Sequence, residues 1–421
     1  MALALGIFIA TYVLLLLLPK YRAYIALVSA VSFVLLGILP GQNVISAVDW
    51  NVLMMIAGTM GIVYLFIESK MPAKMADYII DKTPNVKWAI IALALFAGII
   101  SAFVDNVATV LMVAPVALTI AKKLKISPVQ SIIAIAISSN LQGAATLVGD
   151  TTSILLGGYA GMDFLDFFFF KGRIGMFFVV QLGALVSALI LLVVFKNQSQ
   201  PVRLTDKTEV TDYFPSFLLL GTVVLLILAS FIPEKPATTN GMICIGLMAI
   251  GIARETIRTD DTKAFMKVIK EIDFFTLLLL GSLFVVIEGI REAGVVDEIA
   301  KLFVAISGNN LFLIYTLLVW ASVILSAFID NIPYVATMLP VTSSIATQLG
   351  VDPTILYFGL LAGATLGGNL TPIGASANIT ALGILRKEGH EVATGTFMKI
   401  SVPFTLAAVL TGYVLIWIIW R

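Results

Sequence analysis

The sequence predicts an all-α protein that crosses a membrane many times and consists of two related halves. Hydrophobic residues make up 60% of the 421-residue chain, whereas charged residues make up only 12%. This composition is too apolar for a water-soluble domain and is typical of a polytopic membrane protein. A nearly identical hexapeptide also occurs twice, at 101–106 and 326–331, and each copy places an aspartate in an otherwise apolar segment.

The repeat extends well beyond the two hexapeptides. Aligning residues 101–154 with 326–379, an offset of 225, gives 17 identities over 54 positions without a gap. The identities include prolines, glycines and the Asp-Asn pair, which chance matches in an apolar composition would not align. We therefore divide the chain into a first half at 1–195, a cytoplasmic linker at 196–214 and a second half at 215–421.

The first apolar stretch, residues 3–18, lacks the preceding basic residues of a signal peptide, because Lys20 and Arg22 follow it. The positive-inside rule then places the N-terminus on the outer side of the cell membrane. Nine further segments are long enough to cross, at about 22–39, 50–68, 128–160, 174–195, 215–233, 240–254, 273–290, 354–385 and 401–420. Ten crossings return the C-terminus to the outside.

Two remaining apolar segments, 88–121 and 311–346, carry Asp-Asn near their middles and are bracketed by polar loops. Each has the length of two short helices that meet at a tip, so we expect two re-entrant hairpins. The second is flanked by 307–310 and 347–350, which contain no Lys or Arg, and should open to the outside. Opposite loop charge on similar sequences is typical of an inverted-topology repeat. The first hairpin should open to the cytoplasm, because the segments on either side of it contain seven lysines: Lys70, Lys74, Lys82, Lys87, Lys122, Lys123 and Lys125.

Each half has a second polar cluster, in the middle of the segments at 128–160 and 354–385. Small, hydroxyl and helix-breaking residues in mid-span predict a discontinuous helix. Its unwound carbonyls can coordinate a cation, and the N-terminus of the following half-helix can face an anion. Asp150 fits this place less easily, because a carboxylate repels an anion unless it is paired or protonated. The small residues have an alternative explanation, since they also allow close helix packing.

The two repeated aspartates, Asp105 and Asp330, are the strongest candidates for function. A carboxylate at membrane depth costs about 3 kcal/mol and usually marks an ion pathway or a binding site. The alternative is a structural ion pair with a basic residue. Neither hairpin core contains a Lys or Arg that would serve as this partner, so we favour a binding role.

The motifs at 101–115, 146–153, 326–340 and 367–378 resemble the ion transporter superfamily, whose members contain a citrate-transporter-like domain. The similarity is to the branch that holds arsenite efflux pumps, sodium/proton antiporters of this fold and the melanosomal P protein. The resemblance implies an elevator mechanism and a homodimer.

In the sodium/dicarboxylate members of that superfamily, each hairpin tip carries Ser-Asn-Thr and helps to bind sodium. Here the serine is replaced by aspartate in both halves, and a carboxylate binds a hard cation more strongly and can take up a proton. The resemblance therefore implies Na⁺ or H⁺ coupling sites at Ser101, Asp105, Asn106, Gly149, Ser326, Asp330, Asn331 and Gly374. The substrate contacts that it implies are Asn106, Thr146, Asp150, Thr151, Ser153, Asn331, Thr371, Ser376 and Asn378.

These observations predict a secondary active transporter, coupled to Na⁺ or H⁺, that moves a small anion or a neutral oxyacid such as arsenous acid. Two alternatives stay open: a Na⁺/H⁺ antiporter without an organic substrate, and an ion channel lined by the hairpins. The motif core contains no Lys or Arg to grip a polycarboxylate such as citrate, although helix N-termini can substitute.

Other classes of function are disfavoured. No nucleophile with a nearby base is visible, and the lone Cys244 and lone His390 provide neither a disulfide nor a transition-metal site, so we expect no enzyme. The net charge of +1 argues against a nucleic-acid partner. We expect no cofactor other than Na⁺ as the coupling ion, and the expected partners are the lipid bilayer, the transported ion and a second copy of the chain.

Overall fold

The computed structural model describes residues 1–201, 208–259 and 263–421, so residues 202–207 of the predicted linker lie outside the described part. The described residues form twenty α-helices, with one two-stranded hairpin between β1 (Phe169–Phe170) and β2 (Arg173–Ile174). The helices are α1 (Ala2–Leu17), α2 (Arg22–Leu35), α3 (Val44–Ala47), α4 (Trp50–Glu68), α5 (Met71–Asp81), α6 (Val86–Ser101), α7 (Asn106–Leu124), α8 (Val129–Gln142), α9 (Thr151–Ala160), α10 (Met176–Val194), α11 (Phe214–Ser230), α12 (Thr239–Thr259), α13 (Ala264–Glu271), α14 (Phe274–Glu292), α15 (Val295–Ser307), α16 (Leu311–Ser326), α17 (Asn331–Leu349), α18 (Thr354–Gly367), α19 (Ser376–Lys387) and α20 (Thr394–Trp420). Short 3-10 turns are η1 (Pro19–Tyr21), η2 (Gly41–Asn43), η3 (Gly143–Ala145), η4 (Phe164–Phe167) and η5 (Gly368–Leu370).

The helices confirm the prediction of a helical, multi-pass membrane protein. Among the described residues, six are long and apolar enough to cross a bilayer: α4, α7, α10, α12, α14 and α20. Two bent pairs, α1 with α2 and α15 with α16, raise this number to eight if each pair is one span. Ten crossings were expected from the sequence. The number is lower because the expected crossings at 3–18 and 22–39 form one bent pair, because α11 is short, and because the segments at 128–160 and 354–385 are interrupted.

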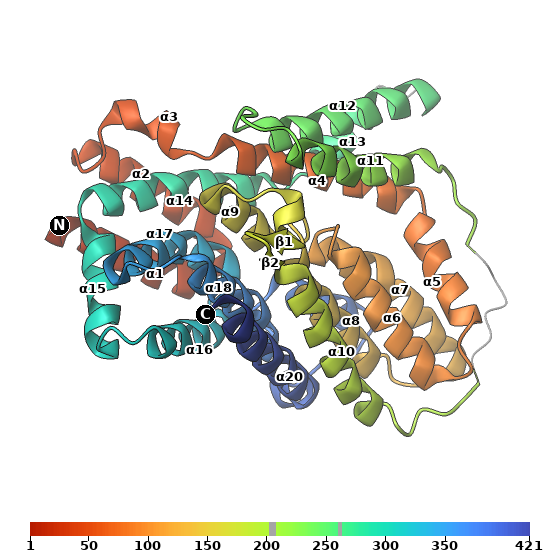
Figure 1. Cartoon of the computed structure of the whole chain (residues 1–421). Coiled ribbons are helices and arrows are strands. Elements are labelled where there is room, and N and C mark those ends of the chain that lie inside the picture. Colours follow the sequence, from red (N-terminus) through yellow and green to blue (C-terminus); the bar gives the residue numbers. More distant parts are fainter. Residues whose placement is uncertain (202–207, 260–262) are drawn as a thin grey trace.

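Both copies of the hexapeptide form the turn of a helix–turn–helix unit. Asp105 is the N-cap of α7, where its Oδ1 accepts hydrogen bonds from the backbone N–H groups of Val107 (2.9 Å) and Ala108 (3.2 Å). Asp330 caps α17 in the same way, accepting from Ile332 N at 3.1 Å. Such a cap stabilises a helix start by about 1 kcal/mol. Figure 1 shows the α6–α7 and α16–α17 units on opposite sides of the molecule.

Both predicted discontinuous helices are interrupted at equivalent places. In the first half, α8 and η3 are followed by the non-helical residues 146–150 before α9 begins. In the second half, α18 and η5 are followed by 371–375 before α19 begins. The polar and small residues of these segments allow the break, because their side chains replace the helical hydrogen bonds that the backbone loses.

Hydrogen bonds hold each break against the turn of its own hairpin. The Thr146 hydroxyl donates to the carbonyl of Ala102, and the Thr371 hydroxyl donates to the carbonyl of Ala327. Donor and acceptor both shift by 225 residues between these two bonds. The sequence repeat is therefore also a repeat of local structure.

The two halves share one core rather than folding separately. α9 of the first half packs against α17 and α18 of the second, and α19 packs against α7 and α8 of the first. α4 packs on α12, α2 on α14, and α10 on α20, which again joins elements of different halves. In Figure 1, α10, α18 and α20 lie between the two helix–turn–helix units. Each hairpin tip consequently lies near a half-helix supplied by the other half.

We expect Gly374→Ala to destabilise the protein by about 1–3 kcal/mol, the usual cost of overpacking. A Cβ at Gly374 would lie 2.6 Å from the carbonyl oxygen of Gly368 and 2.8 Å from that of Ala327, and backbone atoms cannot move aside as a flexible side chain can. The apparent melting temperature in detergent measures the effect. Gly246→Ala in α12 is the control, because its Cβ would meet nothing within 4 Å. Equal melting temperatures of the two variants would contradict this packing.

Candidate functional site

A pocket of about 280 Å³ lies where four helices begin. Its lining includes the first residue of α7 (Asn106), of α9 (Thr151), of α17 (Asn331) and of α19 (Ser376). Both hairpins and both discontinuous helices therefore contribute to one site. The start of a helix presents unpaired N–H groups and a partial positive charge, which suits an anion or a polar solute.

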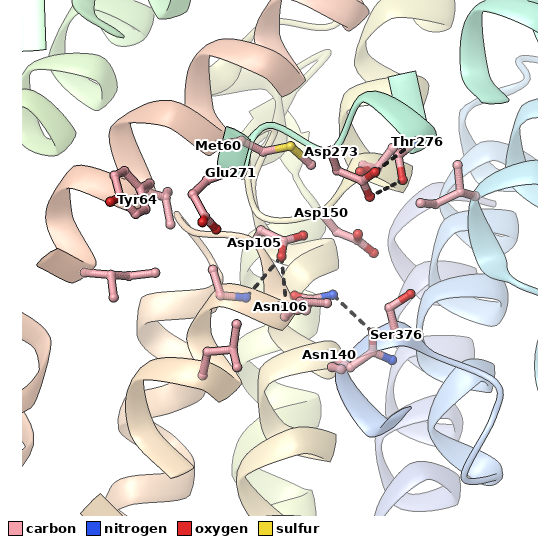
Figure 2. A pocket seen from close by; sticks show the side chains of 18 of the residues that line it. Met60, Tyr64, Asp105, Asn106, Asn140, Asp150, Glu271, Asp273, Thr276 and Ser376 are labelled. Carbon is pink, nitrogen blue, oxygen red and sulfur yellow. Dashed lines mark hydrogen bonds between the residues drawn. The ribbon is translucent and has the colours of Figure 1, made fainter. Parts of the chain in front are cut away.

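Four carboxylates line the same pocket: Asp105, Asp150, Glu271 and Asp273. Figure 2 shows these side chains around one space, with Asp105 and Asp150 near each other. The lining residues include no Lys, Arg or His. An acidic pocket of this kind is a candidate binding site for a cation or a proton.

Asp150 links the first discontinuous helix to the second hairpin. It is only 6% exposed, and its Oδ2 accepts hydrogen bonds from the Thr152 hydroxyl (2.9 Å) and from the Asn331 amide (3.4 Å). Together with Asp105 it also lines a smaller space beside α4. The position equivalent to Asp150 in the second half is Ala375. This carboxylate therefore belongs to the first half alone.

The described residues contain no group of three or more His, Cys, Asp and Glu side chains arranged to hold a metal ion. A transition-metal centre is not supported among them. Sodium does not need such a group, because hard cations accept amide and backbone oxygens beside one or two carboxylates. Asn106 and Asn140 place amide groups in the lining beside Asp105.

A buried chain of amide side chains connects the first hairpin to both broken helices. The Asn106 Oδ1 accepts a hydrogen bond from the Ser101 hydroxyl (2.6 Å), and its Nδ2 donates to Asn140 Oδ1 (3.1 Å). Asn140 Nδ2 in turn donates to the carbonyl of Thr365 (2.9 Å) and to Asn369 Oδ1 (3.1 Å). The sequence-based assignment of the site missed Asn140 and Asn369. Both lie in the polar clusters of the two broken helices, which is the signal that would have included them.

The remaining predicted residues divide into pocket-lining residues and structural ones. Those that line the main pocket are Asp105, Asn106, Asp150, Thr151, Asn331 and Ser376. Gly149 lines the smaller space beside α4. The others are buried in the hairpins and breaks rather than in this lining, and they are Ser101, Thr146, Ser153, Ser326, Thr371, Gly374 and Asn378.

Asp330 differs from Asp105 in its charge environment. Its Oδ2 lies 2.6 Å from Nη1 of Arg22, at the start of α2, and the two side chains are 13% and 20% exposed. The expectation that Asp330 lacks a basic partner is therefore wrong, because the partner comes from outside the hairpin. No Lys or Arg of the described residues forms an ion pair with Asp105.

The citrate transporter family model matches residues 12–363, most of the chain. The chain belongs to the citrate transporter family. This confirms the predicted membership of the ion transporter superfamily, and it identifies the chain as a multi-pass membrane transporter.

Similar proteins agree with this assignment. An uncharacterized transporter of Mycobacterium tuberculosis (strain H37Rv) is 30% identical over 427 residues, covering 99% of this chain and 98% of its own length. An uncharacterized transporter of Mycobacterium bovis is 28% identical over 423 residues, covering 99% and 97%. The P protein of Homo sapiens is 26% identical over 456 residues, which is 88% of this chain but 53% of the P protein.

Two solved structures share the fold. The YdaH transporter of Alcanivorax borkumensis superposes with a TM-score of 0.61 at 14% identity, covering 89% of this chain and 87% of that one. MtrF of Neisseria gonorrhoeae, described with a class of antimetabolite efflux pumps, superposes with a TM-score of 0.56 at 16% identity, covering 89% and 81%. At these identities the similarity concerns the fold alone.

We expect Asn140→Ala to destabilise the transporter by about 1–3 kcal/mol, because it leaves the buried Asn106 amide and Asn369 carbonyl without partners. Thermal unfolding in detergent measures this loss. Asn43→Ala is the matched control, since Asn43 is only half-buried and its amide donates to Glu292 in a hydrogen bond at the surface. If Asn43→Ala lost as much thermal stability as Asn140→Ala, the buried hydrogen bonds among the amide side chains would not explain the loss.

Proposed function

We propose that the transporter is a secondary active transporter in which Asp105 and Asp150 bind the coupling ion, Na⁺ or H⁺. The observation that carries this proposal is the pocket with four carboxylates and no basic side chain in its lining. Asp150 is buried and Asp105 half-buried, so the repulsion between these two carboxylates is stronger than it would be in water, because the local dielectric is lower. A proton or a small cation relieves that repulsion, so occupancy of the pocket by one is favoured.

The transported solute is a small anion or a neutral oxyacid similar to arsenous acid. The starts of α9 and α19 offer N–H groups and the hydroxyls of Thr151 and Ser376 to such a solute. The family description names citrate. A tricarboxylate would face four carboxylates without a single Lys or Arg in the lining, which favours a solute of lower charge.

Na⁺/H⁺ exchange without any solute is the second candidate, and the same carboxylate-rich pocket favours it. In this case Na⁺ and H⁺ compete for Asp105 and Asp150. Adding Na⁺ to purified protein in a weakly buffered solution then releases protons without any anion. Proton release that supports Na⁺ uptake without any solute favours this second candidate.

The proposed transport cycle is an elevator movement within an inverted-topology repeat. The exchange of half-helices supports the repeat, since α9 packs on α17 while α19 packs on α7. Loop charge supports opposite openings of the two hairpins and both termini outside. In this proposal the hairpins and broken helices move together, and the long helices such as α4 and α12 form the static part, in a homodimer.

We expect Asp105→Asn and Asp150→Asn to weaken the apparent affinity for the coupling ion about ten- to a hundredfold, because each removes a charged ligand. Proteoliposomes under a pH gradient provide the assay, with ²²Na⁺ uptake and arsenite uptake as separate readouts. Glu298→Gln is the control, since Glu298 is exposed and forms its ion pair with the nearby Lys301 at the surface. Unchanged gradient-driven flux of both probes in both aspartate variants would refute the proposed coupling site.

A further inference from the structure

The two hairpin tips have almost the same sequence, yet their carboxylates have different partners. Each aspartate uses one oxygen, Oδ1, to cap the helix that follows, α7 in the first half and α17 in the second. The second oxygen of each carboxylate is the one left for a cation. At Asp330 this oxygen is taken by Nη1 of Arg22, at 2.6 Å.

We propose that the Arg22 guanidinium occupies the place of a coupling cation at the second hairpin tip, so that only the tip at Asp105 binds a free cation. This inference rests on the proposed function, which it deepens by assigning the number of coupling sites. Arg22 is then a positioning residue that determines how many coupling cations each transporter binds, rather than a residue that contacts the solute.

The position of Arg22 suits this role. Arg22 is the first residue of α2, directly after the turn at which the chain bends by 115° between α1 and α2. The same N-terminal segment also contacts α17 through Tyr12, whose hydroxyl donates to the carbonyl of Pro333 at 2.7 Å. Two contacts from one segment hold the start of α17, so the guanidinium is fixed relative to Asp330.

The charged residues around the two tips support the same assignment. Asp105 shares its pocket with Asp150, Glu271 and Asp273, and no basic side chain lines that pocket. Asp330 is not among the lining residues, although the neighbouring Asn331 is. At Asp330 the Arg22 guanidinium, 2.6 Å away, supplies the positive charge that a free cation would otherwise bring. A second Na⁺ or H⁺ at Asp330 would have to displace the Arg22 guanidinium, which is covalently part of the chain.

A hydrophobic carbodiimide tests this inference, because it modifies protonated carboxyl groups within membranes and leaves ionised ones unreacted. The purified full-length transporter is labelled in detergent, and adducts at Asp105 and Asp330 are quantified by mass spectrometry. We expect Asp330 in the wild type to carry little adduct, and Arg22→Gln to raise that adduct about tenfold or more, as loss of an opposite charge favours the protonated form. Added Na⁺ should then protect Asp330 in this variant.

Three further variants make the result unambiguous. Lys20→Gln removes an exposed neighbouring charge and should leave labelling of Asp330 unchanged. Arg22→Lys keeps the charge and should keep Asp330 unlabelled. If Arg22→Gln folds poorly, the double variant Arg22→Gln/Asp330→Asn should recover the melting temperature, because no unpaired charge remains.

The inference is overturned if wild-type Asp330 is labelled as readily as Asp105, or if Arg22→Gln leaves its labelling unchanged. Either result would mean that the ion pair opens and that both tips accept cations. The proposed function is tested separately through the flux of Asp105→Asn. Unchanged flux with an unlabelled Asp330 would overturn the proposed function and leave the Arg22 pairing intact.

Discussion

The structure depends on how two aspartates are kept at the depth of the membrane. Each costs about 3 kcal/mol to place there, and a helix cap returns only about 1 kcal/mol of this. The remainder must come from other polar groups, because lipid offers none. This requirement explains why both hairpins, both broken helices and the buried amides meet around one core.

The two halves meet that requirement in different ways. At the hairpin tip of the second half, Arg22 forms an ion pair with Asp330 and balances its negative charge. The pair is part-buried, and its opposite charges neutralise this tip within the protein. In the first half, Asp105 and Asp150 share a pocket whose lining has no basic residue, and we propose that an ion from solution balances their charge. In this proposal the duplicated motif gives one structural ion pair and one site that exchanges its cation.

The repeat, the helix–turn–helix units and the interrupted helices were predictable because their causes are local. The aspartate of each Asp-Asn pair caps the next helix, and the clusters of small and polar residues around 143–153 and 367–378 favour an interruption of the helix. The pocket was only partly predictable. Glu271 and Asp273 come from the junction of α13 and α14, which has no motif in common with the hairpins, and only the folded chain brings them beside Asp105. Arg22 and Asp330 lie 308 residues apart, so no local pattern could pair them.

The central claim, that the carboxylate of the first tip and not that of the second takes up the coupling ion, is tested most directly by infrared difference spectroscopy of the reconstituted transporter. Spectra recorded before and after addition of Na⁺, or across a change of pH, report the ionisation and coordination of individual carboxyl groups. The account predicts a carboxyl band that responds to the cation, that disappears in Asp105→Asn and that survives in Asp330→Asn. A cation-dependent band that is lost in Asp330→Asn but kept in Asp105→Asn would contradict it.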